Sequence, residues 1–232
     1  MTAKIILAGL LTASSVIETS ALAVPSKPMG DLSKRMSDET AGCIIRGDPE
    51  LIEAWFNTLP GSLEERKVVS RRETRFTHCF RTNLAQMRDW VPEYDYPALR
   101  VGLLRFLLKN RIVGVPEKAP AGLSRANWFV SEAISGSGER ASVIANDLGF
   151  CLARSDWPTV RTAVLSIEGS PAEAKALRKL IPLIGGCIPP GAKLRMDLPR
   201  VRAILEETAY HGVGGITAAA LASASYPSRS PR

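Results

Sequence analysis

Two stretches of equal length decide the fold. Residues 43–79 read CIIRGDPELIEAWFNTLPGSLEERKVVSRRETRFTHC, and residues 151–187 read CLARSDWPTVRTAVLSIEGSPAEAKALRKLIPLIGGC. Aligned without gaps, they are identical at eight of 37 positions, where chance would give about two at average residue frequencies. The cysteines at both ends of the two stretches fall on one another. We therefore interpret the chain as a tandem duplication of one supersecondary unit.

Both copies carry the same signals for where helices begin and end. Asp48 and Asp156 precede apolar residues at helical spacing, which is typical of N-caps. The helices that they begin are expected to end at turns containing Gly61 and Gly169. A Ser-x-x-Glu capping box then opens the next helix in each copy. Each copy is therefore expected to form a helical hairpin whose second helix runs to the second cysteine.

The match between the copies resumes after a gap. Residues 97–104 (PALRVGLL) stand opposite residues 199–206 (PRVRAILE), and both runs predict a third helix. The first copy has six more residues than the second between its last cysteine and this helix. Pro182 is expected to kink or end the second helix of the second copy, because proline lacks the N–H that continues a helix.

The hairpin geometry indicates how the four cysteines pair. In each copy the first cysteine lies just before the outgoing helix and the second lies at the end of the returning helix, so antiparallel packing favours Cys43–Cys79 and Cys151–Cys187. The main rival joins the copies, as Cys43–Cys187 and Cys79–Cys151. Zinc is disfavoured, because no two cysteines have the close spacing of a structural site. The expected fold class is all-α, with two tandem helical-hairpin repeats, each closed by one disulfide.

The first 23 residues have the features of a signal peptide. Lys4 supplies positive charge, residues 5–11 are apolar, and Ala21-Leu22-Ala23 forms a small-x-small cleavage signal. A buried N-terminal helix is the alternative, and Glu18 fits it better. We expect cleavage after Ala23, no membrane span, and a periplasmic or secreted protein whose even number of cysteines suits disulfides.

The same reading divides the chain into six segments. They are a signal peptide (1–23), a flexible lead (24–36), helical repeat 1 (37–112), a linker (113–139), helical repeat 2 (140–211) and a disordered tail (212–232). The linker is rich in proline and glycine, and the tail is rich in glycine, alanine and serine. A weak helix over 216–224 is the alternative for the tail.

The chain resembles a set of exported proteins from sphingomonad-type alphaproteobacteria. The resemblance rests on the runs CIIRGDP (43–49), PGSLEE (60–65) and CIPPGA (187–192), and it covers residues 43 to about 210. Those proteins also carry a doubled cysteine-containing helical unit, so the resemblance implies export and a helical fold. It carries over no catalytic residue, because its motifs are caps and cysteines. The first copy departs from the pattern after Cys79, where Phe-Arg-Thr-Asn replaces the proline–glycine turn.

Common signatures of catalysis are missing. The sequence has no Gly-x-Ser-x-Gly, no phosphate loop and no His-Glu-x-x-His, and we expect no cofactor and no metal. His78 and His211 are expected to be solvated or to cap helices. The adjacent acids Glu64–Glu65 and Glu206–Glu207 do not face one another on a helix and are expected at helix ends or on the surface. A glycosidase carboxylate pair built from distant positions stays open.

Two features of the first copy suggest a binding surface. Arg71 and Arg75 share one helix face, and the stretch that the second copy lacks supplies Trp90, Tyr94 and Tyr96. A solvated helix face and a loop folded onto the hairpin are the alternatives. Arginine suits anionic groups and aromatic rings supply contact area, so the expected partner is an anionic component of the cell envelope. Export argues against nucleic acid despite a pI near 9.5.

Composition narrows the class of function. Hydrophobic residues make up 45% and charged residues 23% of the chain, with a net charge of +7, which excludes a mainly disordered chain and a multi-span membrane protein. The favoured hypothesis is an exported, non-catalytic helical binding or scaffold module of the cell envelope. The alternative is an envelope enzyme that acts on cell-wall glycan at a site between the repeats. Converging carboxylates in a deep inter-repeat cleft would favour the enzyme, and a packed interface would favour the module.

Overall fold

The computed structural model describes residues 36–70, 78–79, 96–123, 137–192 and 196–226. Within these residues every regular element is a helix, which confirms the all-α class. None of the described helices is both long enough and apolar enough to cross a membrane.

The helices form two series in the same order. The first half consists of α2 (Asp38–Gly47), α3 (Pro49–Phe56), α4 (Leu63–Ser70) and α6 (Tyr96–Lys109). The second half consists of α7 (Ser137–Ser155), α8 (Trp157–Leu165), α9 (Pro171–Cys187) and α10 (Leu198–Gly212). A short helix, α11 (Ala218–Ser223), follows the second half.

The expected caps form in both halves. Asp48 accepts a hydrogen bond from the Leu51 N–H at 3.1 Å, and Asp156 accepts one from the Thr159 N–H at 3.2 Å. Each aspartate therefore satisfies one of the free N–H groups at the start of its helix. The turns that follow contain Gly61 with φ of 79° and Gly169 with φ of 75°. Glycine adopts this left-handed backbone conformation without steric penalty.

Disulfides close both hairpins as expected. Cys43 is bonded to Cys79 and Cys151 to Cys187, with Cα atoms 5.7 and 5.6 Å apart. Pairing between the two halves of the chain is therefore wrong. Each bond joins the element before a hairpin's first helix to the end of the returning segment, which is the proximity that the duplicated pattern predicted.

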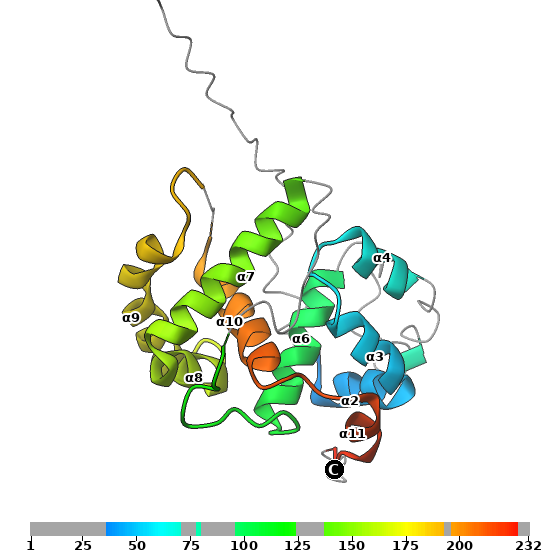
Figure 1. The fold of residues 1–232 in the computed structure, drawn as a ribbon. Coiled ribbons are helices and arrows are strands. Elements are labelled where there is room, and N and C mark those ends of the chain that lie inside the picture. Colours follow the sequence, from blue (N-terminus) through cyan, green and yellow to red (C-terminus); the bar gives the residue numbers. More distant parts are fainter. Residues whose placement is uncertain (1–35, 71–77, 80–95, 124–136, 193–195, 227–232) are drawn as a thin grey trace, which may run out of the picture.

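The two halves meet along α6 and α10. Figure 1 shows these helices in the middle of the molecule, with α2, α3 and α4 on one side and α7, α8 and α9 on the other. Helix α6 packs on α10 and α2, while α10 also packs on α7 and α8. One contiguous apolar core includes side chains from both halves, so the interface between the halves is part of that core.

Each central helix is followed by an ordered strap that lies against the other half. We call residues 110–123 the first strap and residues 213–226 the second strap. The first strap receives hydrogen bonds from α8, where Trp157 Nε1 donates to the Pro116 carbonyl at 3.0 Å. The second strap contains α11, which packs on α3 and α2 and buries Leu221 completely. The expectation of a disordered tail is therefore wrong for residues 213–226, and the alternative of a short helix holds.

Two helix boundaries bear on the sequence expectation, which was that Pro182 would kink or end its helix and that the linker would run to residue 139. Helix α9 continues through Pro182 to Cys187, so the proline does not end it. Helix α7 begins at Ser137, inside the segment assigned to the linker. Proline removes one helical hydrogen bond, and packing of α9 against α8 and α7 supports the helix on both sides of this gap.

Candidate functional site

The proposed binding residues lie mostly outside the described part of the chain. This applies to Arg71, Arg75, Trp90 and Tyr94. Tyr96 is the first residue of α6, half-buried, and its ring meets the ring of Trp55 edge-on with centroids 6.4 Å apart. This tyrosine therefore packs against the first half. His78, also singled out in the sequence, is exposed as expected.

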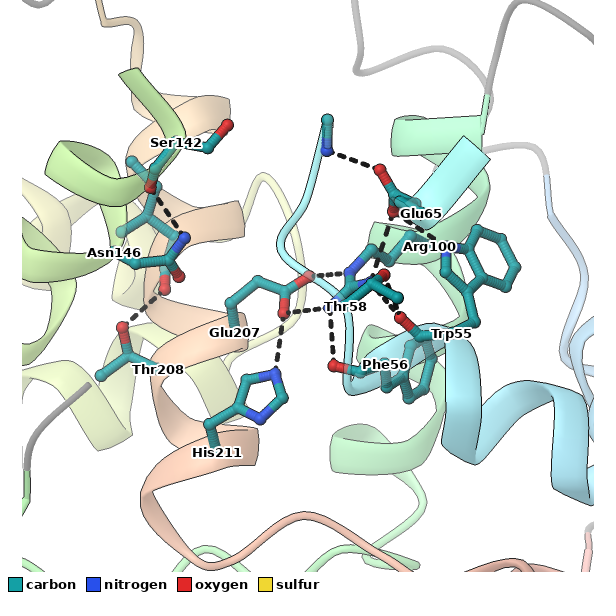
Figure 2. Close-up of polar contacts among 12 residues, drawn as sticks. Trp55, Phe56, Thr58, Glu65, Arg100, Ser142, Asn146, Glu207, Thr208 and His211 are labelled. Atoms are coloured by element: carbon teal, nitrogen blue, oxygen red, sulfur yellow. Dashed lines mark hydrogen bonds and ion pairs between the residues drawn. The ribbon is translucent and has the colours of Figure 1, made fainter. Parts of the chain in front are cut away.

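A network of buried charged side chains occupies the interface between α6 and α10 (Figure 2). Its centre is Arg100, whose side chain is 1% exposed. Arg100 forms a bidentate pair with Glu207 of the other half, with Nε–Oε1 of 2.5 Å and Nη2–Oε2 of 3.0 Å. Its Nη1 lies 3.3 Å from Oε1 of Glu65. One arginine thus holds a carboxylate from each half of the fold.

The first half supplies backbone acceptors to the same guanidinium. Arg100 donates to the carbonyl oxygens of Trp55 at 2.7 Å and Phe56 at 3.0 Å, which lie at the end of α3. Glu65 is held in turn by the indole N–H of Trp55 at 2.8 Å and by the N–H of Gly61 at 2.5 Å. The end of α3, the turn and the start of α4 therefore form a polar cage around Arg100.

The second half builds a similar cage around Arg202, the residue that the sequence alignment pairs with Arg100. Arg202 is 2% exposed, and its Nη1 lies 2.7 Å from Oε1 of Glu173, the counterpart of Glu65. Its Nη2 donates to the carbonyl oxygens of Val164 at 3.4 Å and Ser166 at 2.9 Å. The N–H of Gly169 donates to Glu173, as that of Gly61 does to Glu65.

A second connection between the halves passes through Glu206. This carboxylate is fully buried and accepts hydrogen bonds from Nε of Arg202 at 2.7 Å and from Nε of Arg105 at 2.9 Å. Arg105 belongs to α6 and also pairs with Glu168 at 2.5 Å. The α6–α10 interface is therefore crossed by two ion-paired connections, one at Glu207 and one at Glu206.

His211 lies beside the first connection, one helical turn after Glu207. Its Nε2 is 3.3 Å from Oε2 of Glu207, and its side chain is 3% exposed. Burial lowers the pKa of His211 to about 4, although the adjacent carboxylate opposes this shift. Burial alone would raise the pKa of Glu207, but Arg100 and His211 outweigh it and hold that pKa at about 2. At neutral pH the network therefore contains an ionised Glu207 and an uncharged His211.

Close packing of α7 on α10 fixes the helix that carries these groups (Figure 2). A Cβ atom added at Gly149 of α7 would lie 2.0 Å from Oγ1 of Thr208, so only glycine allows this approach. Thr208 donates to the carbonyl of Ile204 at 2.8 Å, and Asn146 donates to the carbonyl of Ser142 at 2.9 Å. Glu207 is therefore carried on a helix that has little room to shift.

The charged groups of the network are paired across the interface between the halves, and Glu207 does not suit the role of a general acid. A general acid at neutral pH needs a carboxyl whose pKa is raised, and the pKa of Glu207 is lowered. Each of the four buried glutamates, Glu65, Glu173, Glu206 and Glu207, lies within 3.3 Å of an arginine nitrogen. Across the described residues, no group of three or more His, Cys, Asp or Glu side chains could hold a metal ion.

Sequence reasoning misplaced several of these groups. Glu206 and Glu207 were expected at helix ends or on the surface, and His211 was expected to be solvated or capping. All three are buried, because α10 is surrounded by other helices and every residue from 205 to 211 is buried. Ser62 caps α4 as expected by accepting from the Glu65 N–H at 3.0 Å, and Glu65, at the start of that helix, is buried. The missed signal was Arg100, which recurs as Arg202 when the match between the copies resumes.

Comparison with protein-family models, curated proteins and solved structures finds no match to this chain.

Proposed function

We propose that the protein is an exported, non-catalytic helical module of the cell envelope that binds or scaffolds another component. The signal-like first 23 residues support export, and two disulfides suit an oxidising compartment such as the periplasm or the extracellular space. The resemblance to exported sphingomonad-type proteins agrees with this proposal. The expected partner is an anionic envelope component that contacts Arg71, Arg75, Trp90, Tyr94 and Tyr96.

One observation carries the non-catalytic part of the proposal. The carboxylates that converge between the halves are buried and paired with arginine, as Glu207 is with Arg100 and Glu206 is with Arg105. A glycosidase needs two carboxyl groups that face a sugar, and one of them must stay protonated near neutral pH. Both glutamates are occupied by arginine rather than facing an open site, and the pKa of Glu207 is lowered, not raised. This favours the module over an enzyme acting on cell-wall glycan at the interface between the halves.

We also infer that the two halves arose by duplication of one unit. Besides the eight identities, the halves share contacts at aligned positions. Arg100 and Arg202 bind the aligned glutamates Glu65 and Glu173, and each arginine donates to a carbonyl at the end of the preceding short helix. Under this inference the unit is a four-helix structural motif, seen as α2, α3, α4 and α6 in the first half and as α7 to α10 in the second.

The proposal can be tested with the purified chain and a native envelope extract. We expect immobilised protein to capture anionic envelope material, and a Trp90→Ala/Tyr94→Ala variant to lose most of it while its melting temperature stays within about 2 °C. Leu63→Ala, at an exposed position on α4, is the matched control and should capture normally. Hydrolysis of cell-wall glycan by the wild type, abolished by Glu207→Gln in a folded protein, would establish the enzyme instead.

A further inference from the structure

The two straps are held in corresponding ways. In the second half, Arg154 donates to the Leu123 carbonyl at 3.0 Å and Arg161 donates to the Val115 carbonyl at 3.2 Å, both on the first strap. The alignment pairs these arginines with Arg46 and Glu53 of the first half. Both of those residues hold the second strap. The fold therefore contains two like units, each of which places its strap on the other.

The second strap has a defined seat, which we call the acceptor surface and which includes Arg46, Glu53 and Phe106. The Ala218 N–H donates to Oε2 of Glu53 at 2.7 Å. The ring of Tyr226 stacks on Phe106 with centroids 6.1 Å apart, and the Arg46 guanidinium lies 5.0 Å from the Tyr226 centroid. Leu221 is buried between these two contacts, fully covered. One backbone hydrogen bond, one buried leucine and one stacked tyrosine thus hold the second strap on the acceptor surface.

The second strap is also the strap that can leave its seat. It is connected to α10 through Gly214 (φ 88°) and Gly215 (φ 69°), and glycine reaches other backbone conformations with little steric cost. Within α11, only Leu221 is buried. Few buried contacts and a glycine hinge make this segment easier to open than the core helices.

We propose that two copies of this chain exchange their second straps, so that each copy's α11 seats on the acceptor surface of the other. A second copy is the occupant that the structure supports, because it carries the Leu221 and Tyr226 side chains that already fit. The exchanged dimer re-forms the contacts of the closed monomer, which keeps the energetic difference between them small. It also repeats between copies the strap placement that the two halves show within one chain. The inference rests on this symmetry and not on the binding activity proposed above.

A second copy's strap must compete with the chain's own strap for the acceptor surface, and this competition sets the protein concentration at which exchange occurs. A tethered strap has an effective concentration on the order of 1 mM, so the closed monomer should dominate at micromolar protein. We expect dimers to appear as the protein concentration approaches this value. Deleting Gly214 and Gly215 shortens the hinge, hinders seating within one chain and should lower the dimer Kd at least about tenfold.

Light scattering on size-exclusion fractions of the full exported chain tests this from about 10 μM to about 1 mM. The wild type and the hinge deletion should both form dimers, the deletion at lower concentration. Leu221→Asp should remain monomeric, while Leu63→Asp, at an exposed leucine, should match the wild type. A chain ending at Gly212 should also be monomeric, which covers the case of a misfolded Leu221→Asp. A monomeric hinge deletion at 1 mM, or a dimer of the chain ending at Gly212, would overturn the proposal.

Discussion

Arg100 and Arg202 occupy aligned positions in the two halves and each pairs with an aligned glutamate, but the second carboxylate partner comes from a different place in each half. Arg100 pairs with Glu207 across the interface, whereas Arg202 pairs with Glu206 of its own helix. The difference arises at one aligned position, where the first half has Arg105 and the second half has Glu207. Because the first half has arginine there, Arg202 faces another cation, and Glu206 lies between the two. The pairing therefore favours contact between unlike halves over contact between two identical ones.

The turns between the hairpin helices also differ, in how far their aligned apolar residues are exposed to solvent. Leu59, in the turn of the first half, is 1% exposed, whereas its counterpart Ile167 is 81% exposed. The first-half turn lies beside α7, since Oγ of Ser142 is 3.4 Å from a Cβ built at Gly61. Sequence matching predicts an equivalent role for the two apolar residues, and the surroundings decide that only one belongs to the core.

Replacing each arginine separately gives the largest expected effect and tests whether Arg100 contributes more to stability than Arg202. Arg100→Met leaves Glu65 and Glu207 buried without this cation, so we expect the free energy of unfolding to fall by about 3–5 kcal/mol. Arg202→Met should cost at least about 1 kcal/mol less, because Glu206 keeps Arg105. Urea denaturation measures both, with exposed Arg178→Met as the control. A larger loss for Arg202→Met would contradict the comparison.

The disulfides should contribute equally, unlike the arginines. Both bonds join cysteines 36 positions apart, so the loop-closure entropy removed from the unfolded chain is the same. Replacing either pair with alanine should lower the free energy of unfolding by about 3 kcal/mol in the chain-entropy view. Thermal and urea unfolding of Cys43→Ala/Cys79→Ala and Cys151→Ala/Cys187→Ala provide the test, and a difference above about 2 kcal/mol would show unequal native surroundings.

Acid should destabilise the fold through His211 of the second half. The first half has Lys109 at the aligned position and therefore no histidine there. The folded protein keeps His211 uncharged down to pH about 4, whereas the unfolded chain binds a proton below its ordinary pKa of 6.5. Stability therefore falls as pH drops from 6.5 to 4, by up to about 3 kcal/mol from this residue. Below about 4.5, uptake of a proton by Glu207 in the unfolded chain adds a further loss down to pH about 2.

The variant His211→Gln isolates the histidine contribution. Its unfolding free energy, measured by urea titration at several pH values, should change less than that of the wild type between pH 6.5 and 4. Identical pH profiles for the two proteins would show that His211 does not titrate with a lowered pKa.

The smallest expected difference concerns the two turns. Leu59→Ala should lower the free energy of unfolding by about 2 kcal/mol or more, because it removes buried methyl groups and leaves a cavity. Ile167→Ala should change it by less than about 0.5 kcal/mol, because the side chain is already in water. Parallel denaturation curves check the pair, and equal losses would mean that Ile167 is covered in solution.

Local signals in the sequence were sufficient for the hairpins. The N-caps at Asp48 and Asp156 and the pairing of all four cysteines depend on neighbouring residues and on antiparallel geometry, which spacing alone reveals. Helix α11 was anticipated only as an alternative, a weak helix over 216–224, and the place where the second strap packs was not predicted. That strap is held by residues of α2, α3 and α6 that are more than a hundred positions away.

The charged network escaped prediction for a related reason. Adjacent acids such as Glu206 and Glu207 are usually solvated, and their burial depends on cations from another helix. Arg100 and Arg202 recur at one aligned position, which indicates a shared role, but the sequence does not say whether that role is buried. Only the packing of α6 on α10 brings the partners together.

The most direct test of whether the buried ion pairs hold the two halves together is a double-mutant cycle on Arg100 and Glu207. Arg100→Met and Glu207→Gln should each be strongly destabilising, because each leaves a buried charge with fewer partners. The double variant should lose at least about 2 kcal/mol less unfolding free energy than the sum of the two single losses. Additive losses in urea denaturation would contradict the account, since they would mean that the Arg100–Glu207 pair does not couple the two halves.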